Sequence, residues 1–252
     1  MKSKRIKVIS VLLVLALLVS SLVFSVNADE DFTWETYDKG YITIVFDDGK
    51  MPITQQAAEI FEEFGMPMSA AIPAKLVEYD NELYHVLMDI QDNGGEILSH
   101  GYNHIPIVDT TNPEYASKTN NAARYIDTSS ATAVADMDYE LGESWRKLNN
   151  LGFNVNGMIQ VGCGGAEGTA DFELVESVAR KYYKYSDGSG VSPQYKLTRR
   201  SASWDSLANL KKRIDNAATN KTWQVLYVHS FKEITSDAST EDGAILREVT
   251  VY

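Results

Sequence analysis

Two adjacent carboxylates, Asp47 and Asp48, follow an apolar, strand-forming run in the segment ITIVFDDGK. Side chains alternate between the two faces of a strand, so both carboxylates can face one site only where the strand breaks, and Gly49 permits such a break. Carboxylates held together raise each other's pKa unless a nearby cation relieves the repulsion. The tripeptide alone is typical of a polar turn, and it becomes a candidate site only if a cation binds beside it.

Two histidines, His100 and His104 in the segment SHGYNH, are suited to hold such a cation. Imidazoles four residues apart meet on one face if the chain turns helically there, which suits neighbouring metal ligands. Two neutral imidazoles and one carboxylate make a three-ligand set that leaves positions open for water and substrate, as in catalytic zinc sites. In this combination we interpret one aspartate as a ligand and the other as a general base.

A third histidine, His229, closes the strongly apolar run WQVLYVH. Packing alone does not readily explain a histidine at that position, so we interpret it as functional. The remaining histidine, His85, lies inside a predicted helix, and we interpret it as structural. Three of the four histidines therefore mark the ends of predicted strands.

Seven strand-forming runs alternate with segments of helical periodicity. The strands are predicted at residues 41–46, 67–73, 95–99, 153–161, 183–186, 196–201 and 223–229. The first two helical segments stop at Gly65 and Gly94. This order predicts an α/β fold with a parallel sheet and outer helices, either doubly wound or closed into a barrel. In both architectures functional groups gather at the C-terminal ends of the strands.

One irregular stretch, residues 105–131, is rich in Thr, Asn and Ser. It is too long to be a plain connector. Loops of this length form a lid or a binding rim, or carry a short helix of their own.

The composition is that of an ordinary globular domain, with 252 residues, 44% hydrophobic and 23% charged. Four of the 23 Lys and Arg residues and none of the 35 Asp and Glu residues lie in residues 1–28, so residues 29–252 carry a formal charge of −16. So acidic a domain disfavours nucleic acid and anionic lipid as partners. The single cysteine, Cys163, excludes an internal disulfide.

Residues 1–28 are predicted to be an export signal. They combine the basic MKSKRIK, a long apolar run, and small residues at Val26 and Ala28 where a cleavage site requires them. An uncleaved anchor helix is the alternative, because the apolar run approaches the roughly 20 residues that span a bilayer. Either way, we expect the domain, residues 38–252, to be secreted or held at the cell surface.

The motifs IVFDDG and SHGYNH, with VLYVHS near the end, together resemble the polysaccharide deacetylases of the NodB-homology type, carbohydrate esterase family 4. The resemblance spans about residues 40–230. It implies a distorted (β/α) barrel of about seven parallel strands. It also implies a divalent metal, usually zinc with cobalt as a substitute, held by an Asp-His-His triad.

The resemblance also implies a role for each matched residue. Asp47 would be the general base, while Asp48, His100 and His104 would hold the metal. His229 would be the general acid that protonates the leaving group.

The chain departs from the family at the third motif. The family usually has an arginine there that orients the base, whereas this chain reads QVGCGGAEG. Backbone N–H groups in this segment, such as that of Gly164, could still stabilise an oxyanion. The orienting role falls to Arg199 or Arg200 at the end of KLTRR, and we assign it to Arg200.

Two further candidates rest on position. Asp187 in KYSDGSG follows a strand-like run and is the candidate for the aspartate that tunes the acid histidine, although an Asp-Gly turn explains it equally well. Tyr102, between the two metal histidines, is a candidate to contact a sugar ring, although aromatic residues are more often part of a core.

These features predict a metal-dependent hydrolase that removes acetyl groups from a polysaccharide. The expected substrate is N-acetylglucosamine in peptidoglycan or a chitin-like polymer, and we expect a monomer without nucleic-acid partners. A membrane would be contacted only through an uncleaved N-terminal segment. The alternatives are an O-acetyl esterase of the xylan type and a non-catalytic carbohydrate-binding homologue, the latter because the third and fourth motifs are altered.

Overall fold

The computed structural model describes residues 39–118, 124–162, 166–188, 190–202 and 206–229. The predicted export signal, Cys163, Gly164 and the C-terminal run ILREVTVY lie outside the described residues. Within the described part of the chain, none of the helices combines the length and the apolar character needed to cross a bilayer.

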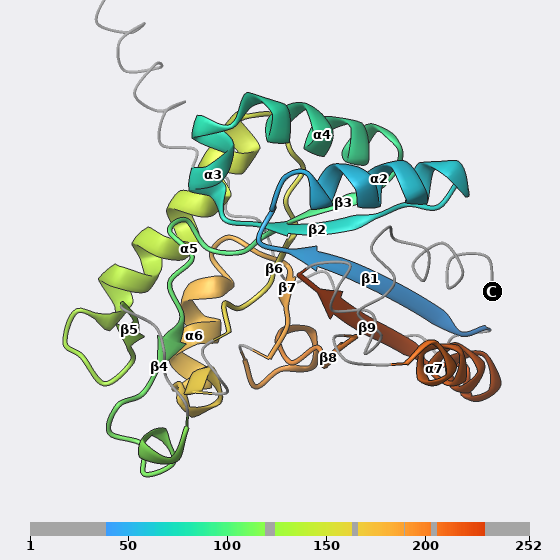
Figure 1. Ribbon diagram of the computed structural model, residues 1–252. Coiled ribbons are helices and arrows are strands. Elements are labelled where there is room, and N and C mark those ends of the chain that lie inside the picture. Colours follow the sequence, from blue (N-terminus) through green and yellow to red (C-terminus); the bar gives the residue numbers. More distant parts are fainter. Residues whose placement is uncertain (1–38, 119–123, 163–165, 189, 203–205, 230–252) are drawn as a thin grey trace, which may run out of the picture. The chain divides into compact units, whose positions relative to one another are not determined.

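A seven-stranded parallel sheet forms the centre of the fold (Figure 1). Its strands follow the order β7-β6-β3-β2-β1-β9-β8. Their bounds are β1 Tyr41–Asp47, β2 Ser69–Ile72, β3 Glu96–Ser99, β6 Gly157–Met158, β7 Tyr185–Ser186, β8 Arg199–Ser201 and β9 Trp223–Val228. All seven predicted strands are present, which confirms the expected parallel α/β fold.

The two edges of this sheet meet, so that the sheet curls into a distorted barrel. Asp187, just after β7, forms a parallel bridge with Leu197, just before β8. Two backbone hydrogen bonds make this closure: Leu197 N–H donates to Ser186 O over 3.2 Å, and Gly188 N–H donates to Leu197 O over 3.1 Å. Of the two predicted architectures, a doubly wound sheet and a closed barrel, the structure therefore shows the barrel.

Amphipathic helices surround the sheet, as their periodicity predicts. They are α2 Ile53–Glu63, α3 Ala74–Tyr79, α4 Asn81–Asp92, α5 Ala133–Asn150, α6 Phe172–Ala179 and α7 Leu207–Asn220. The helices α2 and α4 lie side by side, as do α5 and α6 (Figure 1). Their apolar faces join the core, in which Leu87, Met137 and Leu148 are fully buried. The short α3 is not predicted by the sequence pattern.

The irregular stretch at 105–131 contains a second, small sheet that the sequence analysis did not predict. Its two strands, β4 Ile107–Val108 and β5 Ile126–Asp127, pair in parallel. Single-turn helices complete the fold at η1 Tyr115–Ser117, η2 Ala166–Thr169 and η3 Pro193–Tyr195. Strands this short carry too little alternation to be recognised from sequence.

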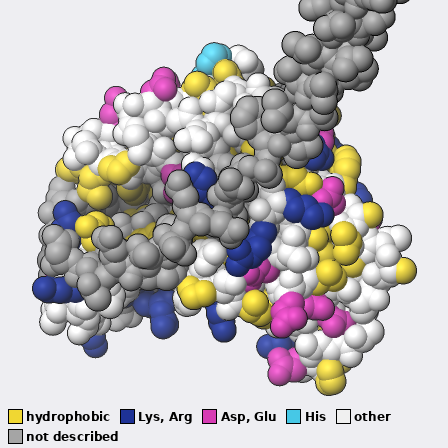
Figure 2. Space-filling view, turned by 180° about the vertical axis from the view of Figure 1, so that it is seen from behind, with side chains coloured by type: hydrophobic (Ala, Val, Ile, Leu, Met, Phe, Trp, Pro, Cys, Tyr) yellow, Lys and Arg dark blue, Asp and Glu magenta, His cyan; other side chains and the backbone are white. Residues whose placement is uncertain are grey.

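The face shown in Figure 2 carries both acidic and basic side chains, with hydrophobic side chains between them. The excess of acidic residues in the sequence therefore does not make this face uniformly acidic.

Candidate active site

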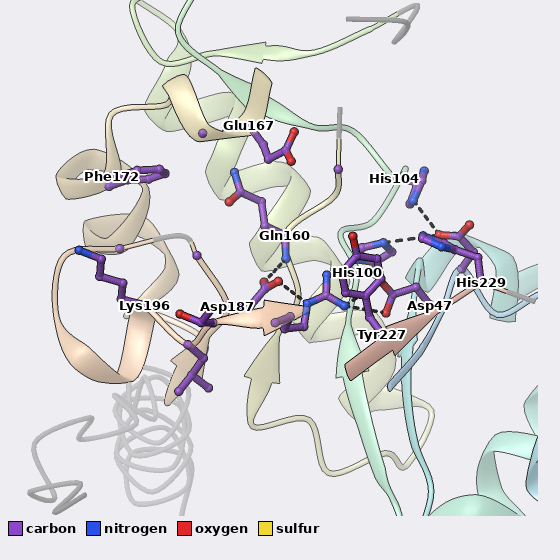
Figure 3. A pocket seen from close by; sticks show the side chains of 18 residues that line it. Asp47, His100, His104, Gln160, Glu167, Phe172, Asp187, Lys196, Tyr227 and His229 are labelled. Carbon is purple, nitrogen blue, oxygen red and sulfur yellow. Dashed lines mark hydrogen bonds and ion pairs between the residues drawn. The ribbon is translucent and has the colours of Figure 1, made fainter. Parts of the chain in front are cut away.

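The C-terminal ends of the parallel strands surround a cavity of about 670 Å³ (Figure 3). Residues from four strand ends line it: Asp47 and Asp48 at the end of β1, His100 and His104 after β3, Asp187 after β7 and His229 after β9. The strand order places these ends next to one another although they are up to 182 positions apart in the sequence, as Asp47 and His229 are. The sequence-predicted groups therefore share one site.

Three of these groups form a compact set of metal-type ligands. Asp48, His100 and His104 each present one ligand atom, and these atoms lie within 4.8 Å of one another. Oδ1 of Asp48 is 3.5 Å from Nε2 of His100 and 3.1 Å from Nε2 of His104. One carboxylate oxygen and two imidazole nitrogens are donors that Zn²⁺ prefers.

The hydrogen bonding around these atoms fits a cation. Oδ1 of Asp48 is buried and receives no hydrogen bond of proper geometry from the described residues. Nδ1 of His100 lies 2.9 Å from the carbonyl oxygen of Ile159. Because a carbonyl only accepts, Nδ1 carries the proton in neutral His100, and the lone pair of Nε2 faces Asp48. The lone pairs of His100 Nε2 and Asp48 Oδ1 repel each other, whereas a cation between them is attracted by both.

The chain turns sharply at both ligand segments. Asp48 has a φ of 73° and Gly49 a φ of 61°, so the break at the end of β1 begins at Asp48 itself. Gly101 and His104 have φ values of 73° and 62°. The segment from His100 to His104 is not helical, in contrast to the expected helical turn. The histidines meet because two left-handed residues fold the segment back, and strain of this kind at His104 is typical of functional sites.

A buried carboxylate on α5, Glu140, holds the histidine segment in this conformation. Its side chain is 1% exposed. Oε1 accepts from the backbone N–H of Asn103 over 2.8 Å and of Ile105 over 3.2 Å, and Oε2 accepts from Nδ2 of Asn103 over 3.0 Å. Glu140 is not among the residues predicted from the sequence. Its signal is a carboxylate on the buried stripe of an amphipathic helix, between Met137 and Leu141.

Arg199, and not Arg200, contacts the predicted base. Nη1 of Arg199 donates to Oδ1 and Oδ2 of Asp47 over 3.1 and 2.8 Å. Arg200 is exposed. The assignment to Arg200 is therefore corrected, and the reason is strand geometry: neighbouring residues of β8 point to opposite faces, and only Arg199 points into the barrel.

Asp187 contacts the other side of the Arg199 guanidinium. Its Oδ2 accepts from Nε of Arg199, and its Oδ1 accepts from the backbone N–H of Gln160 over 2.6 Å. Burial raises the pKa of Asp187, and Arg199 opposes that rise. Asp187 thus acts on Asp47 through Arg199, whereas its action on the acid histidine stays a prediction.

The remaining candidates lie at or near the cavity. The His229 ring lies edge-to-face against Tyr227, with 5.7 Å between ring centroids. Tyr102 donates its hydroxyl to Oε2 of Glu78 over 3.0 Å and borders the metal-type ligands from outside the main cavity. In the altered third motif, Gly162 lines the cavity, while the predicted oxyanion donor Gly164 lies outside the described residues.

Lys50 is a competitor for the same carboxylate. Its Nζ lies 2.8 Å from Oδ2 of Asp48, and its side chain is 54% exposed. A divalent ion at Asp48 would be repelled by this exposed ammonium by about 1 kcal/mol in water, once screening by salt is included. We therefore expect Lys50→Met to bind Zn²⁺ roughly fivefold more tightly, measured by competition with a chelating dye.

The control for this measurement is Lys184→Met, because Lys184 is exposed and precedes β7 at the opposite end of the strands. An unchanged or weaker affinity in Lys50→Met would show that Lys50 does not compete with the cation.

Comparison with known proteins gives a consistent result. Residues 35–140 match the family model described as polysaccharide deacetylase. A carbohydrate esterase family 4 esterase from Streptococcus mutans is similar in structure, with 15% identity, a TM-score of 0.51, and coverage of 86% of this chain and 83% of that chain. Among curated proteins, none matches this sequence.

Two further solved structures are similar at low identity. One is a BA3943 mutant described as a family 4 pseudoenzyme with restored enzymatic activity, with 11% identity, a TM-score of 0.51, and coverage of 85% of this chain and 64% of that chain. The other is a family 4 carbohydrate esterase from Streptomyces lividans in complex with acetate, with 16% identity, a TM-score of 0.49, and coverage of 84% and 86%.

Proposed function

The chain carries a polysaccharide deacetylase domain of the NodB-homology type, carbohydrate esterase family 4, and from this premise we propose that it is a metal-dependent hydrolase that removes acetyl groups from an extracellular polysaccharide. The proposed substrate is N-acetylglucosamine in peptidoglycan or a chitin-like polymer. Residues 1–28 are proposed to direct the domain out of the cytoplasm, because their charge and apolar pattern is that of an export signal.

The observation that carries the proposal is the position of Asp47 beside the Asp48, His100 and His104 ligand set. Asp47 is 4% exposed and is bound by the Arg199 guanidinium, so its carboxylate is fixed at the wall of the cavity. A ligand set with a fixed carboxylate beside it supplies the groups that hydrolysis of an acetyl group requires.

In the proposed mechanism Asp47 accepts a proton from the water that attacks the acetyl carbonyl. Arg199 holds the Asp47 carboxylate toward that water. His229 donates a proton to the leaving nitrogen, so that acetate and a free amine result. Asp48, His100 and His104 would hold a divalent ion, which when bound supplies Lewis-acid polarisation of the carbonyl and of water.

The test is acetate release from a panel of substrates by the chelator-treated chain, before and after addition of Zn²⁺ or Co²⁺. The panel contains N-acetylated chito-oligosaccharides, peptidoglycan fragments and acetylxylan. We expect at least a hundredfold gain in rate on adding metal, because Lewis-acid catalysis contributes several kcal/mol. His104→Ala is expected to lose this gain.

The matched control is His85→Ala, because His85 is exposed on α4, away from the site. Release from acetylxylan alone would favour the O-acetyl esterase. Sugar binding without acetate release from any substrate would contradict the proposed hydrolase and favour a carbohydrate-binding protein.

A further inference from the structure

A second cavity, of about 410 Å³, adjoins the candidate metal site. Asp48 and His104 line both this cavity and the main one. The second cavity lies between α3 and the histidine segment. Its walls are mainly apolar and include Pro73, Leu76 and Tyr102, and Leu76 is 43% exposed. A polymer whose acetyl group lies at the metal site would therefore place a neighbouring sugar in this cavity.

One positive charge on the wall of the second cavity, that of Lys75, interacts electrostatically with Glu78 but forms no ion pair with it. Of its charged residues, Asp48 and Lys50 pair with each other over 2.8 Å. Lys75 also lines the cavity, and no carboxylate of the described residues lies within ion-pair distance of its Nζ. Residues 29–252 carry a formal charge of −16, and such a cation locally offsets a field that repels anions.

Lys75 is held in place by a relay that begins in the core. Nζ of Lys75 donates to Oδ1 of Asn103 over 3.1 Å. The Asn103 amide is oriented because its Nδ2 donates to the buried carboxylate of Glu140 over 3.0 Å. A carboxylate accepts hydrogen bonds and donates none, so the amide oxygen of Asn103 is left to face Lys75. The backbone N–H of Lys75 also donates to Tyr102 O over 3.1 Å. The ammonium is exposed, is held by this one side-chain hydrogen bond, and keeps two N–H groups for a ligand.

We propose that the second cavity is a subsite for a sugar that carries a carboxylate and adjoins the acetylated sugar, with Lys75 binding that carboxylate. The apolar surface of Leu76 and Tyr102 packs against the sugar ring, and the lysine selects its charged substituent. The inference rests on the proposed function, which it refines: the acetylated sugar is followed by an acidic one. The carboxylate belongs either to a lactyl ether or to a uronic acid.

The test compares acetate release from three oligosaccharides of equal length. One is a neutral N-acetylated chito-oligosaccharide, one alternates N-acetylglucosamine with a lactyl-ether sugar, and one alternates it with a uronic acid. We expect Lys75→Met to raise KM about tenfold on a carboxylated substrate, with kcat retained and with the neutral KM within about twofold. Lys75→Arg is expected to restore the carboxylate preference, and Lys184→Met to leave it unchanged. The carboxylated substrate that responds identifies the source.

An equal effect of Lys75→Met on all three substrates, or no effect, would overturn the subsite. If the wild type releases no acetate from any substrate, the proposed function fails, and the subsite is tested by binding to the zinc-loaded chain. A carboxylate preference that Lys75→Met abolishes then supports it. Equal affinity for the three oligosaccharides, or no binding at all, overturns it.

Discussion

Asp47→Asn is expected to lower the rate of acetate release by roughly a hundredfold to ten-thousandfold while leaving Zn²⁺ binding unchanged. The carboxamide has nearly the shape of the carboxylate and its oxygen still accepts from Arg199, so the site should keep its structure. An amide, however, does not accept a proton from water near neutral pH. The measurement is kcat together with the zinc content of the purified variant.

The comparison variant is Asp48→Asn, since Asp48 and not Asp47 belongs to the ligand set with His100 and His104. We expect it to lose zinc and activity together. If Asp47→Asn lost zinc to the same extent, Asp47 would be a ligand rather than a base. Full activity in Asp47→Asn would refute the proposed mechanism.

The strands and most helices of this fold could be predicted because their signals are local. The central strands β1 and β9 are apolar runs, and each long helix has a periodic apolar face. The strand pair β4–β5 and the short α3 could not be predicted, because two-residue strands and six-residue helices are too short to show a periodic pattern of apolar residues. What selects the barrel is the bridge between Asp187 and Leu197, which depends on how the sheet curls.

The candidate site shows the same division. Asp48, His100 and His104 could be grouped from their strand-end positions and residue types. The choice between Arg199 and Arg200 could not be made from the sequence. A shift of one residue in the predicted strand register exchanges the inward-facing and outward-facing side chains. Closure of the barrel brings Asp187 beside Arg199, and the strand order β1-β9-β8 lets this guanidinium reach Asp47 although the third motif has no arginine.

Arg199→Met is expected to reduce the free energy of unfolding by about 3–5 kcal/mol, because removing one partner of a buried ion pair leaves uncompensated charge. The Arg199 side chain is 9% exposed, and Asp47 and Asp187 are 4% and 9% exposed. Arg200→Met, at an exposed position of the same strand, should change the free energy of unfolding by less than about 0.5 kcal/mol. Urea unfolding of the chelator-treated chain measures both, without any contribution from bound metal.

The loss in Arg199→Met should depend on pH in a defined direction. Burial raises the pKa of Asp187, and without the guanidinium that opposes the rise it should climb further. A carboxyl whose pKa is raised in the folded state destabilises the fold as pH rises through that pKa, because the unfolded chain gives up the proton more readily. The defect should therefore be smaller at pH 4 than at pH 7.

Adding Asp187→Asn to Arg199→Met separates the charge effect from the loss of packing. The double variant buries one fewer unpaired carboxylate, so it should recover about 1–2 kcal/mol at pH 7 and lose part of its pH dependence. If Arg199 acted only through its contact with the Tyr227 ring, 4.6 Å from the guanidinium, the two substitutions would be additive and the defect would be the same at both pH values. Recovery in the double variant would instead assign the buried guanidinium the role of joining the carboxylates of Asp47 and Asp187.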